Sequence, residues 1–336
     1  MFRRILVPLD GSPRARRALP LAARIARASG GSVILFSVLE PAIQVAWRTQ
    51  LVPVQMENRM AERKGMTAEL TRQAASEALR GVETTVEIAE GFPAPLILER
   101  AEERQADLIV LCSHGRTGLT RWALGSVAQK VASRSAIPVL IVREGSEQKR
   151  KLPAKGTRPV CVMVALDGSA FAEAVIRPAA NLSLALSAPL PGALHLVHVA
   201  PLLVEPVRAV ELTREGQQPY DLLPLEETRI IAAATASLNR VQQQIQEEMG
   251  EGGKLQITSL VLADLDVAGS LLAEAEHAQG RGSDEEAQGC DVLALATHGR
   301  SGPARWFVGS VTQRILNSAR QPLLIVRPPT SQEKPR

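Results

Sequence analysis

Aromatic side chains are scarce in this chain of 336 residues, because Phe, Trp and Tyr together make up 3% of the sequence. Proteins that bind single-stranded nucleic acid stack the bases on such side chains. Residues 1–150 carry an excess of Lys and Arg, whereas residues 159–336 carry an excess of Asp and Glu. Since so few aromatic groups accompany the basic half, we interpret most of these charges as solvated helix faces and do not expect a nucleic-acid partner.

Cysteine and long apolar runs are also scarce. The three cysteines, Cys112, Cys161 and Cys290, form no CxxC pair and no metal-ligand spacing, a usage typical of a reducing compartment. No apolar run approaches the roughly 18 residues of a membrane span. The apolar start of the chain ends at Asp10 and is too short for a secretory signal peptide. The sequence therefore predicts a cytoplasmic protein without a membrane partner.

Two parts of the sequence occur twice. Residues 113–143 and 297–327 align without a gap and agree at 15 of 31 positions, and ILVPLDGS at 5–12 returns as VMVALDGS at 162–169. Solenoid repeats are only about 20–50 residues long, whereas these copies lie half a chain apart in a sequence long enough for about two domains. We therefore predict a duplicated domain. The expected parts are domain 1 at 1–143, a linker at 144–158, domain 2 at 159–328 and a tail at 329–336.

Short runs of Val, Ile and Leu alternate with longer amphipathic or polar segments in both halves. Such runs, without polar alternation, are typical of strands buried on both faces. The expected strands are 3–9, 32–39, 82–89, 107–113, 138–143, 160–166, 193–199, 255–262, 291–297 and 322–327. The expected helices are 13–29, 56–80, 94–104, 126–134, one from about 170, 225–248, 267–277 and 310–318. This order predicts an α/β fold with two doubly wound, mostly parallel, five-stranded Rossmann-like sheets.

Polar and glycine residues follow the strands that should border the ligand crevice. In a doubly wound sheet, ligands bind beyond the carboxyl ends of the strands, where the strand order reverses. Asp10 follows the first strand, residues 114–118 follow the fourth, and Gly125-Ser126 begins the next helix. Glycines let backbone amides approach an anion, and a helix N-terminus favours phosphate. Asp10 could accept hydrogen bonds from a ribose or hold Mg²⁺ through water.

The same residues also have a purely structural explanation. Gly115 and Gly125 could be turn residues, and Ser126 could be a helix cap. Neither GxxxxGK[ST] nor GxGxxG nor GxSxG occurs, which excludes a P-loop, a dinucleotide fingerprint and a nucleophile elbow. We interpret the remaining candidates as structural: turn histidines His114 and His298, an inert thiol at Cys112, and packing residues Trp122 and Trp306.

The segments LVPLDGS, SHGRTG, GSV and IPVLIVR resemble a universal stress protein. Both halves carry the set in order, so the chain is similar to a tandem universal stress protein over almost its whole length. The family's nucleotide motif is G-x2-G-x9-G-[ST]. Cys112 and Ala296 stand at its first glycine, and the other positions match in both copies, namely Gly115, Gly125, Ser126, Gly299, Gly309 and Ser310.

The resemblance implies ATP, with Mg²⁺ as its companion ion, across the carboxyl edge of each sheet. Pro8 and Asp10 would contact adenosine and ribose, and the backbone of Val38 would meet the adenine. The phosphates would lie against Gly115, Gly125 and Ser126, and Cys112 would lie near the ribose and phosphates. The counterparts in the second half are Asp167, Val199, Ala296, Gly299, Gly309 and Ser310, with Ala165 in the place of Pro8.

The resemblance also implies how the halves pair. Residues 138–143 and 322–327 would lie antiparallel and join the two sheets into a pseudo-dimer, and a homodimer of whole chains is a further option. The leading functional hypothesis is an ATP-binding stress-response protein with little or no catalysis. A slow Mg-dependent ATPase would need a positioned water and a base, for which Asp10 and His114 are weak candidates. The third hypothesis is a nucleotide-free protein-interaction scaffold.

Overall fold

The computed structural model describes residues 1–40, 52–113, 124–143, 152–201, 223–249, 255–277, 289–297 and 309–328. The chain divides into two compact units. Unit 1 comprises Met1–Lys151 with Arg320–Arg327, and unit 2 comprises Leu152–Ala319 with Pro328–Arg336. Part of the expected linker, residues 144–151, lies outside the described residues.

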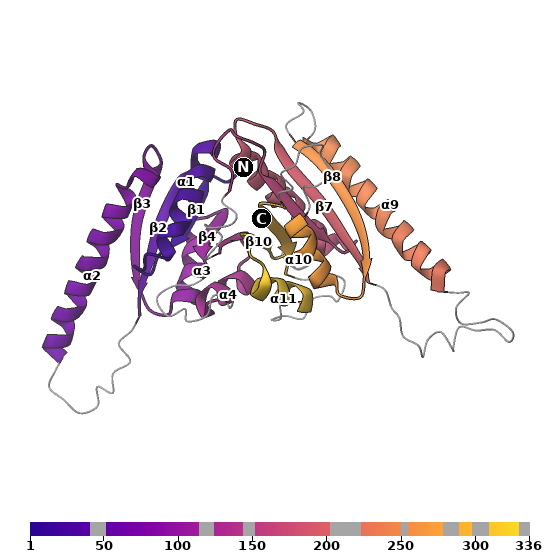
Figure 1. Cartoon of the computed structure of the whole chain (residues 1–336). Coiled ribbons are helices and arrows are strands. Elements are labelled where there is room, and N and C mark those ends of the chain that lie inside the picture. Colours follow the sequence, from indigo (N-terminus) through magenta and orange to yellow (C-terminus); the bar gives the residue numbers. More distant parts are fainter. Residues whose placement is uncertain are drawn as a thin grey trace. The chain divides into compact units, whose positions relative to one another are not determined.

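Five parallel strands form the centre of unit 1 (Figure 1). They are β1 (Arg4–Pro8), β2 (Ser32–Leu39), β3 (Glu83–Glu90), β4 (Leu108–Cys112) and β5 (Val139–Val142), in the order β3-β2-β1-β4-β5. Ile5, Leu6 and Val7 are fully buried, because helices cover both faces of a parallel sheet. The strand predictions for this half are confirmed to within one or two residues.

The last strand of the chain joins unit 1. Strand β10 (Leu323–Val326) runs antiparallel to β5, with Leu324 opposite Leu140 and Ile325 opposite Val139. This is the pairing that the family resemblance implied, and it gives β5 a partner on the side away from β4. The register buries Leu323 and Leu324 completely.

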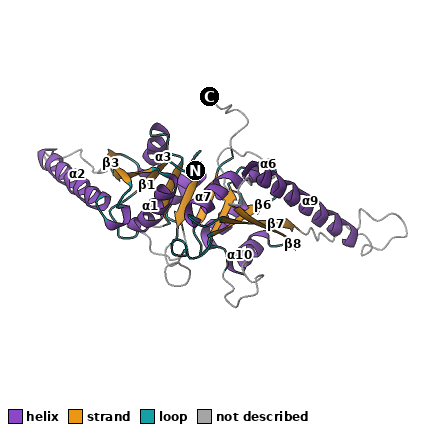
Figure 2. Ribbon diagram, turned by 90° about the horizontal axis from the view of Figure 1, so that it is seen from above, coloured by secondary structure: helices purple, strands orange, loops and turns teal. Residues whose placement is uncertain are grey.

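The helices of unit 1 are α1 (Ala18–Ser29), α2 (Val52–Ala74), α3 (Pro93–Glu103) and α4 (Ser126–Arg134). Right-handed crossovers place α1 and α2 on one face of the sheet and α3 and α4 on the other, and Figure 2 shows α1 and α3 on opposite sides of the strands. The first helix begins later than predicted. The Ser12 hydroxyl accepts a hydrogen bond from the amide of Ala15, the first residue of a short 3₁₀ turn, Ala15–Arg17, and regular α-helix starts only at Ala18.

Unit 2 repeats the plan with four parallel strands in the order β8-β7-β6-β9. Their bounds are β6 (Cys161–Leu166), β7 (Gly192–Pro201), β8 (Leu255–Asp264) and β9 (Val292–Ala296). Its helices are α6 (Ala170–Glu173), α7 (Ile176–Ser187), α9 (Leu223–Met249), α10 (Val267–His277) and α11 (Ser310–Ser318). The single helix expected from about residue 170 is therefore interrupted at Ala174 and Val175.

The architecture confirms the predicted α/β class with a mostly parallel sheet. In unit 1 the chain moves outward from β1 to β2 and β3, then returns across the sheet to β4 on the other side of β1. The strand order therefore reverses between β1 and β4, and a crevice forms at their carboxyl ends. Among the described residues, no helix has the length and apolarity that crossing a membrane would require.

Candidate functional site

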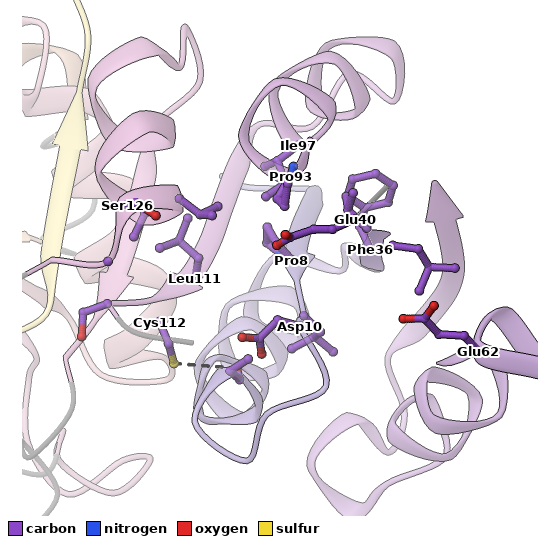
Figure 3. A pocket seen from close by; sticks show the side chains of 18 residues that line it. Pro8, Asp10, Phe36, Glu40, Glu62, Pro93, Ile97, Leu111, Cys112 and Ser126 are labelled. Atoms are coloured by element: carbon purple, nitrogen blue, oxygen red, sulfur yellow. Dashed lines mark hydrogen bonds between the residues drawn. The ribbon is translucent and has the colours of Figure 1, made fainter. Parts of the chain in front are cut away.

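A pocket of about 410 Å³ opens where β1 and β4 end. Its walls come from the segments that follow β1, β2 and β4, from the N-terminal turns of α3 and α4, and from α2 (Figure 3). A volume of this size lies within the usual range of small-molecule sites, about 300–1,000 Å³. The pocket lies entirely within unit 1.

Six residues selected from the sequence line this one pocket: Pro8, Asp10, Val38, Cys112, Gly125 and Ser126. They come from four different elements, so the topological reversal brings them together. Gly115 and His114 lie outside the described residues, as do Trp122 and, in the second half, His298, Gly299 and Trp306. The pocket is also lined by residues that the sequence analysis did not select, among them Phe36, Glu40, Glu62, Pro93 and Ile97.

The carboxyl group of Asp10 is fixed by the turn that follows β1. Its Oδ1 accepts a hydrogen bond from the Ser12 amide at 2.9 Å, and the Ser12 hydroxyl accepts one from the Ala15 amide at 3.1 Å. Gly11 makes the turn possible because its φ is 81°, a left-handed value that side chains disfavour. The turn therefore holds a carboxylate in the wall of the pocket, between its two ends.

The same turn is built again in unit 2. The Ser169 amide donates to Asp167 Oδ1 at 2.9 Å, the Ser169 hydroxyl accepts from the Ala172 amide at 3.2 Å, and Gly168 has φ 79°. The two DGS segments are therefore equivalent in conformation as well as in sequence. The duplication preserves the position of an aspartate at the end of the first strand of each unit.

The opposite wall of the pocket is the N-terminus of α4. Gly125, and not Ser126, is the N-cap of this helix, and its amide donates to the Ser113 carbonyl at 2.8 Å. Ser126 is the first helical residue and is exposed, so the alternative that it caps the helix is wrong. The amides of the first helical turn have no carbonyl partner within the helix and point toward the pocket end. This end therefore carries a partial positive charge.

The glycine at this N-cap is not required by the backbone. Gly125 has φ −61°, and its counterpart Gly309 has φ −57°, values that any residue adopts. A Cβ added to Gly309 would meet the Thr297 carbonyl oxygen at 3.6 Å, an ordinary contact. A turn requirement therefore does not explain these two glycines. What their missing side chains do provide is room for another group to approach the helix amides.

Cys112 ends β4 and lines the floor of the pocket (Figure 3). Its thiol donates to the Arg14 carbonyl at 2.9 Å and lies 3.7 Å from the Ala15 carbonyl oxygen. The sulfur is therefore directed toward the turn that precedes α1, and the side chain is half-buried. The counterpart in unit 2, Ala296, is 7% exposed, and its side chain is smaller because it lacks the sulfur atom.

The corresponding edge of unit 2 is acidic. Ser270 donates a hydrogen bond to Asp264, which lowers the pKa of that carboxyl group. The pKa of Asp266 is lowered first by a hydrogen bond from the Gly269 amide and then by Arg314, whose guanidinium bonds both carboxylate oxygens. Because Arg314 belongs to α11 and Asp266 precedes α10, this ion pair links the two helices that would flank a ligand in unit 2.

Arrangements that could bind a metal directly are absent from the described ranges, which contain no suitable group of three or more His, Cys, Asp or Glu side chains. The chemistry of the unit 1 pocket is that of a binding site. It combines an apolar floor, a carboxylate near its middle and a helix N-terminus at one end. This combination suits a ligand with a hydroxyl-bearing centre and an anionic tail.

Comparisons with known proteins agree with this description. The model of the universal stress protein family matches residues 1–143 and 284–327, which is more than half of the chain. A universal stress protein of Methanocaldococcus jannaschii is 32% identical over 157 residues, covering 44% of this chain and 86% of that protein. One of Bacillus subtilis is 33% identical over 150 residues, covering 43% of this chain and 100% of that protein. The solved structure of a universal stress protein from Archaeoglobus fulgidus shares the fold, with a TM-score of 0.58 at 16% identity over 98% of this chain and 97% of that one.

Proposed function

Because the chain belongs to the universal stress protein family, we propose that the pocket of unit 1 binds an adenine nucleotide, ATP, and that the protein acts through this binding with little or no catalysis. The observation that carries the proposal is the convergence of Pro8, Asp10, Val38, Cys112, Gly125 and Ser126 in one pocket of about 410 Å³. Six residues chosen for one ligand thus border one cavity.

The residues present fit ATP part by part. The phosphates would lie at the N-terminus of α4, where amides and the Ser126 hydroxyl donate hydrogen bonds and Gly125 leaves room. Asp10 would accept hydrogen bonds from the ribose hydroxyls, since the turn holds its carboxylate between the two ends of the pocket. The apolar wall around Val38 and Phe36 would receive the base. A Mg²⁺ ion would reach the protein through water and the phosphates rather than through a dedicated cluster of ligands.

We propose the edge of unit 2 as a second, weaker site for the same ligand. Asp167, Val199, Ala296, Gly309 and Ser310 occupy positions equivalent to those in unit 1. However, Asp264 bonds Ser270 of α10, and Asp266 pairs with Arg314 of α11, the helix that would receive the phosphates. Carboxylates near a triphosphate disfavour its binding by charge repulsion.

The rival functions differ in what they require. A slow ATPase needs a group that positions or deprotonates water. Of the two weak candidates, Asp10 and His114, only Asp10 lies among the described residues, and its carboxylate already accepts a hydrogen bond within a turn. The pseudo-dimer of the two halves through β5 and β10, a homodimer of whole chains and the cytoplasmic location all stay predictions. A nucleotide-free scaffold would leave the pocket without a purpose.

One experiment separates the three functions. Nucleotide-stripped protein and its Asp10→Ala variant are titrated with a fluorescent ATP analogue, and ATP turnover is measured on the same samples. We expect saturable binding that Asp10→Ala weakens at least tenfold, since it removes charge-assisted hydrogen bonds to the ribose. Turnover should stay at background. Turnover lost with Asp10→Ala would support the ATPase, and no binding by either protein would support the scaffold.

A further inference from the structure

The pocket of unit 1 has opposite electrostatic character at its two ends. Figure 3 shows Ser126 at one end, Glu62 at the other, and Asp10 between them. The N-terminus of α4 attracts a phosphate, whereas the carboxylates of Glu40 and Glu62 repel it. This inference rests on the proposed function: a nucleotide in the pocket would lie with its phosphates against α4 and its base toward Glu40 and Glu62.

Glu62 comes from α2, a helix outside the nucleotide motif, and Arg59 holds this helix against the sheet. The Arg59 guanidinium donates to the Glu40 backbone carbonyl at 2.9 Å and to Glu90 Oε1 at 2.5 Å. It also lies 3.9 Å from Glu62 Oε2. Three elements therefore meet at one side chain: the end of β2, the end of β3 and the wall of the pocket formed by α2. The side chain of Arg59 is only 25% exposed, in keeping with this central position.

A carboxylate accepts hydrogen bonds and donates none. The edge of a base that faces Glu40 and Glu62 must therefore offer N–H groups. We propose that Glu62, positioned by Arg59, and Glu40 recognise the exocyclic amino group of a purine base. Both carboxylates are exposed, so water competes for the contact and the preference should be moderate rather than absolute.

Unit 2 provides an internal comparison. By the strand register, Pro201 stands at the position of Glu40 and Ala263 at the position of Glu90. Neither side chain carries a charge, so at these two positions unit 2 lacks the carboxylates of Glu40 and Glu90.

The test compares three nucleotides that share ribose, triphosphate and a purine ring. ATP carries a 6-amino group and GTP carries a 2-amino group and an N1–H, whereas purine riboside triphosphate carries neither an exocyclic amino group nor an N1–H. Dissociation constants are measured on stripped full-length protein by calorimetry. We expect ATP to bind about tenfold more tightly than purine riboside triphosphate. In Glu62→Gln and in Arg59→Met this ratio should fall to about threefold or less. The control is Glu102→Gln, an exposed residue of α3 with the same charge change as Glu62→Gln, and it should keep the native ratio.

The ratio of the two dissociation constants is the decisive readout. Removing the negative charge of Glu62 strengthens the binding of every triphosphate equally, so this effect cancels in the ratio. Equal affinity of the native protein for ATP and purine riboside triphosphate would overturn the inference and leave the proposed function standing. A native preference that survives in both variants would overturn it too. GTP that binds as weakly as purine riboside triphosphate assigns the contact to the 6-amino group, and GTP that matches ATP supports recognition of N–H groups on either base. If none of the three binds, the proposed function itself fails.

Discussion

Replacing Gly125 by valine tests the role of the α4 N-terminus. The backbone at Gly125 has φ −61°, so valine fits the conformation, and its branched side chain would stand at the pocket end where the phosphates are proposed to lie. The substitution therefore blocks the approach of an anion without straining the turn. It also replaces a tolerated N-cap residue by a poor one, which costs about 1 kcal/mol of stability.

The magnitude follows from the contacts that would be lost. A hydrogen bond to a charged group contributes about 1.5–3 kcal/mol. Loss of two such bonds between the phosphates and the helix amides corresponds to about 3–6 kcal/mol, or about 10²- to 10⁴-fold in Kd. This loss is much larger than the expected loss of stability, so the two effects can be separated in one preparation.

The assay is calorimetric ATP binding together with urea denaturation, using Gly309→Val as the matched control. Gly309 occupies the same N-cap position in α11, and an added Cβ would meet only the Thr297 carbonyl oxygen at 3.6 Å. The control should lose similar stability and keep the tight site. If Gly125→Val keeps native ATP affinity while folded, or if Gly309→Val loses as much, the assignment of the phosphates to α4 is wrong.

Three further predictions concern stability and titration. Arg158 donates two hydrogen bonds to the nearly buried Asp291, at 2.8 and 2.7 Å, and these bonds raise the pKa of Arg158. Arg158→Met should therefore destabilise unit 2 by about 1–3 kcal/mol in urea denaturation without changing ATP affinity in unit 1. Unchanged stability would contradict this prediction. Gly11 has φ 81°, so Gly11→Ala should lower the free energy of unfolding by about 1 kcal/mol and weaken ATP binding by displacing Asp10. Denaturation and calorimetry measure the two effects. An alanine variant as stable as the native protein would show that the backbone at this position is not strained. Because the pKa values of Asp264 and Asp266 are lowered by folding, their stabilisation should be complete above the usual aspartate pKa and be lost as the pH falls through the lowered values. Carboxyl NMR titration of Arg314→Met should show the pKa of Asp266 moved upward, with Asp264 little changed, and an unmoved Asp266 would contradict the role of the ion pair.

Much of the fold was predictable because its strands are buried on both faces. Val, Ile and Leu then follow one another without polar alternation, as within residues 4–8 and 108–112. Such short apolar runs are typical of strands in a parallel sheet. The turns in the two DGS segments were not predicted, although an aspartate, a glycine and a serine at that spacing can form the observed hydrogen bonds among themselves. The motif residues that line the pocket meet there because they lie at or just beyond the carboxyl ends of strands or at the start of α4.

The parts that sequence reasoning missed have no such local signal. Glu62 and Arg59 lie on a long polar helix whose charges resemble any solvated surface, and only the folding of α2 against the ends of β2 and β3 gives them a site to face. The delayed start of α1 and the break between α6 and α7 are short-range choices between 3₁₀ and α geometry. Such choices are decided by packing rather than by periodicity.

The most direct test of the central claim is a calorimetric titration of nucleotide-stripped protein with ATP and Mg²⁺. Our account predicts one tight equivalent of ATP per chain, which Gly125→Val removes and Gly309→Val leaves in place. A tight equivalent that survives in Gly125→Val would place the ligand outside unit 1. The absence of any binding heat at several temperatures would contradict the account altogether.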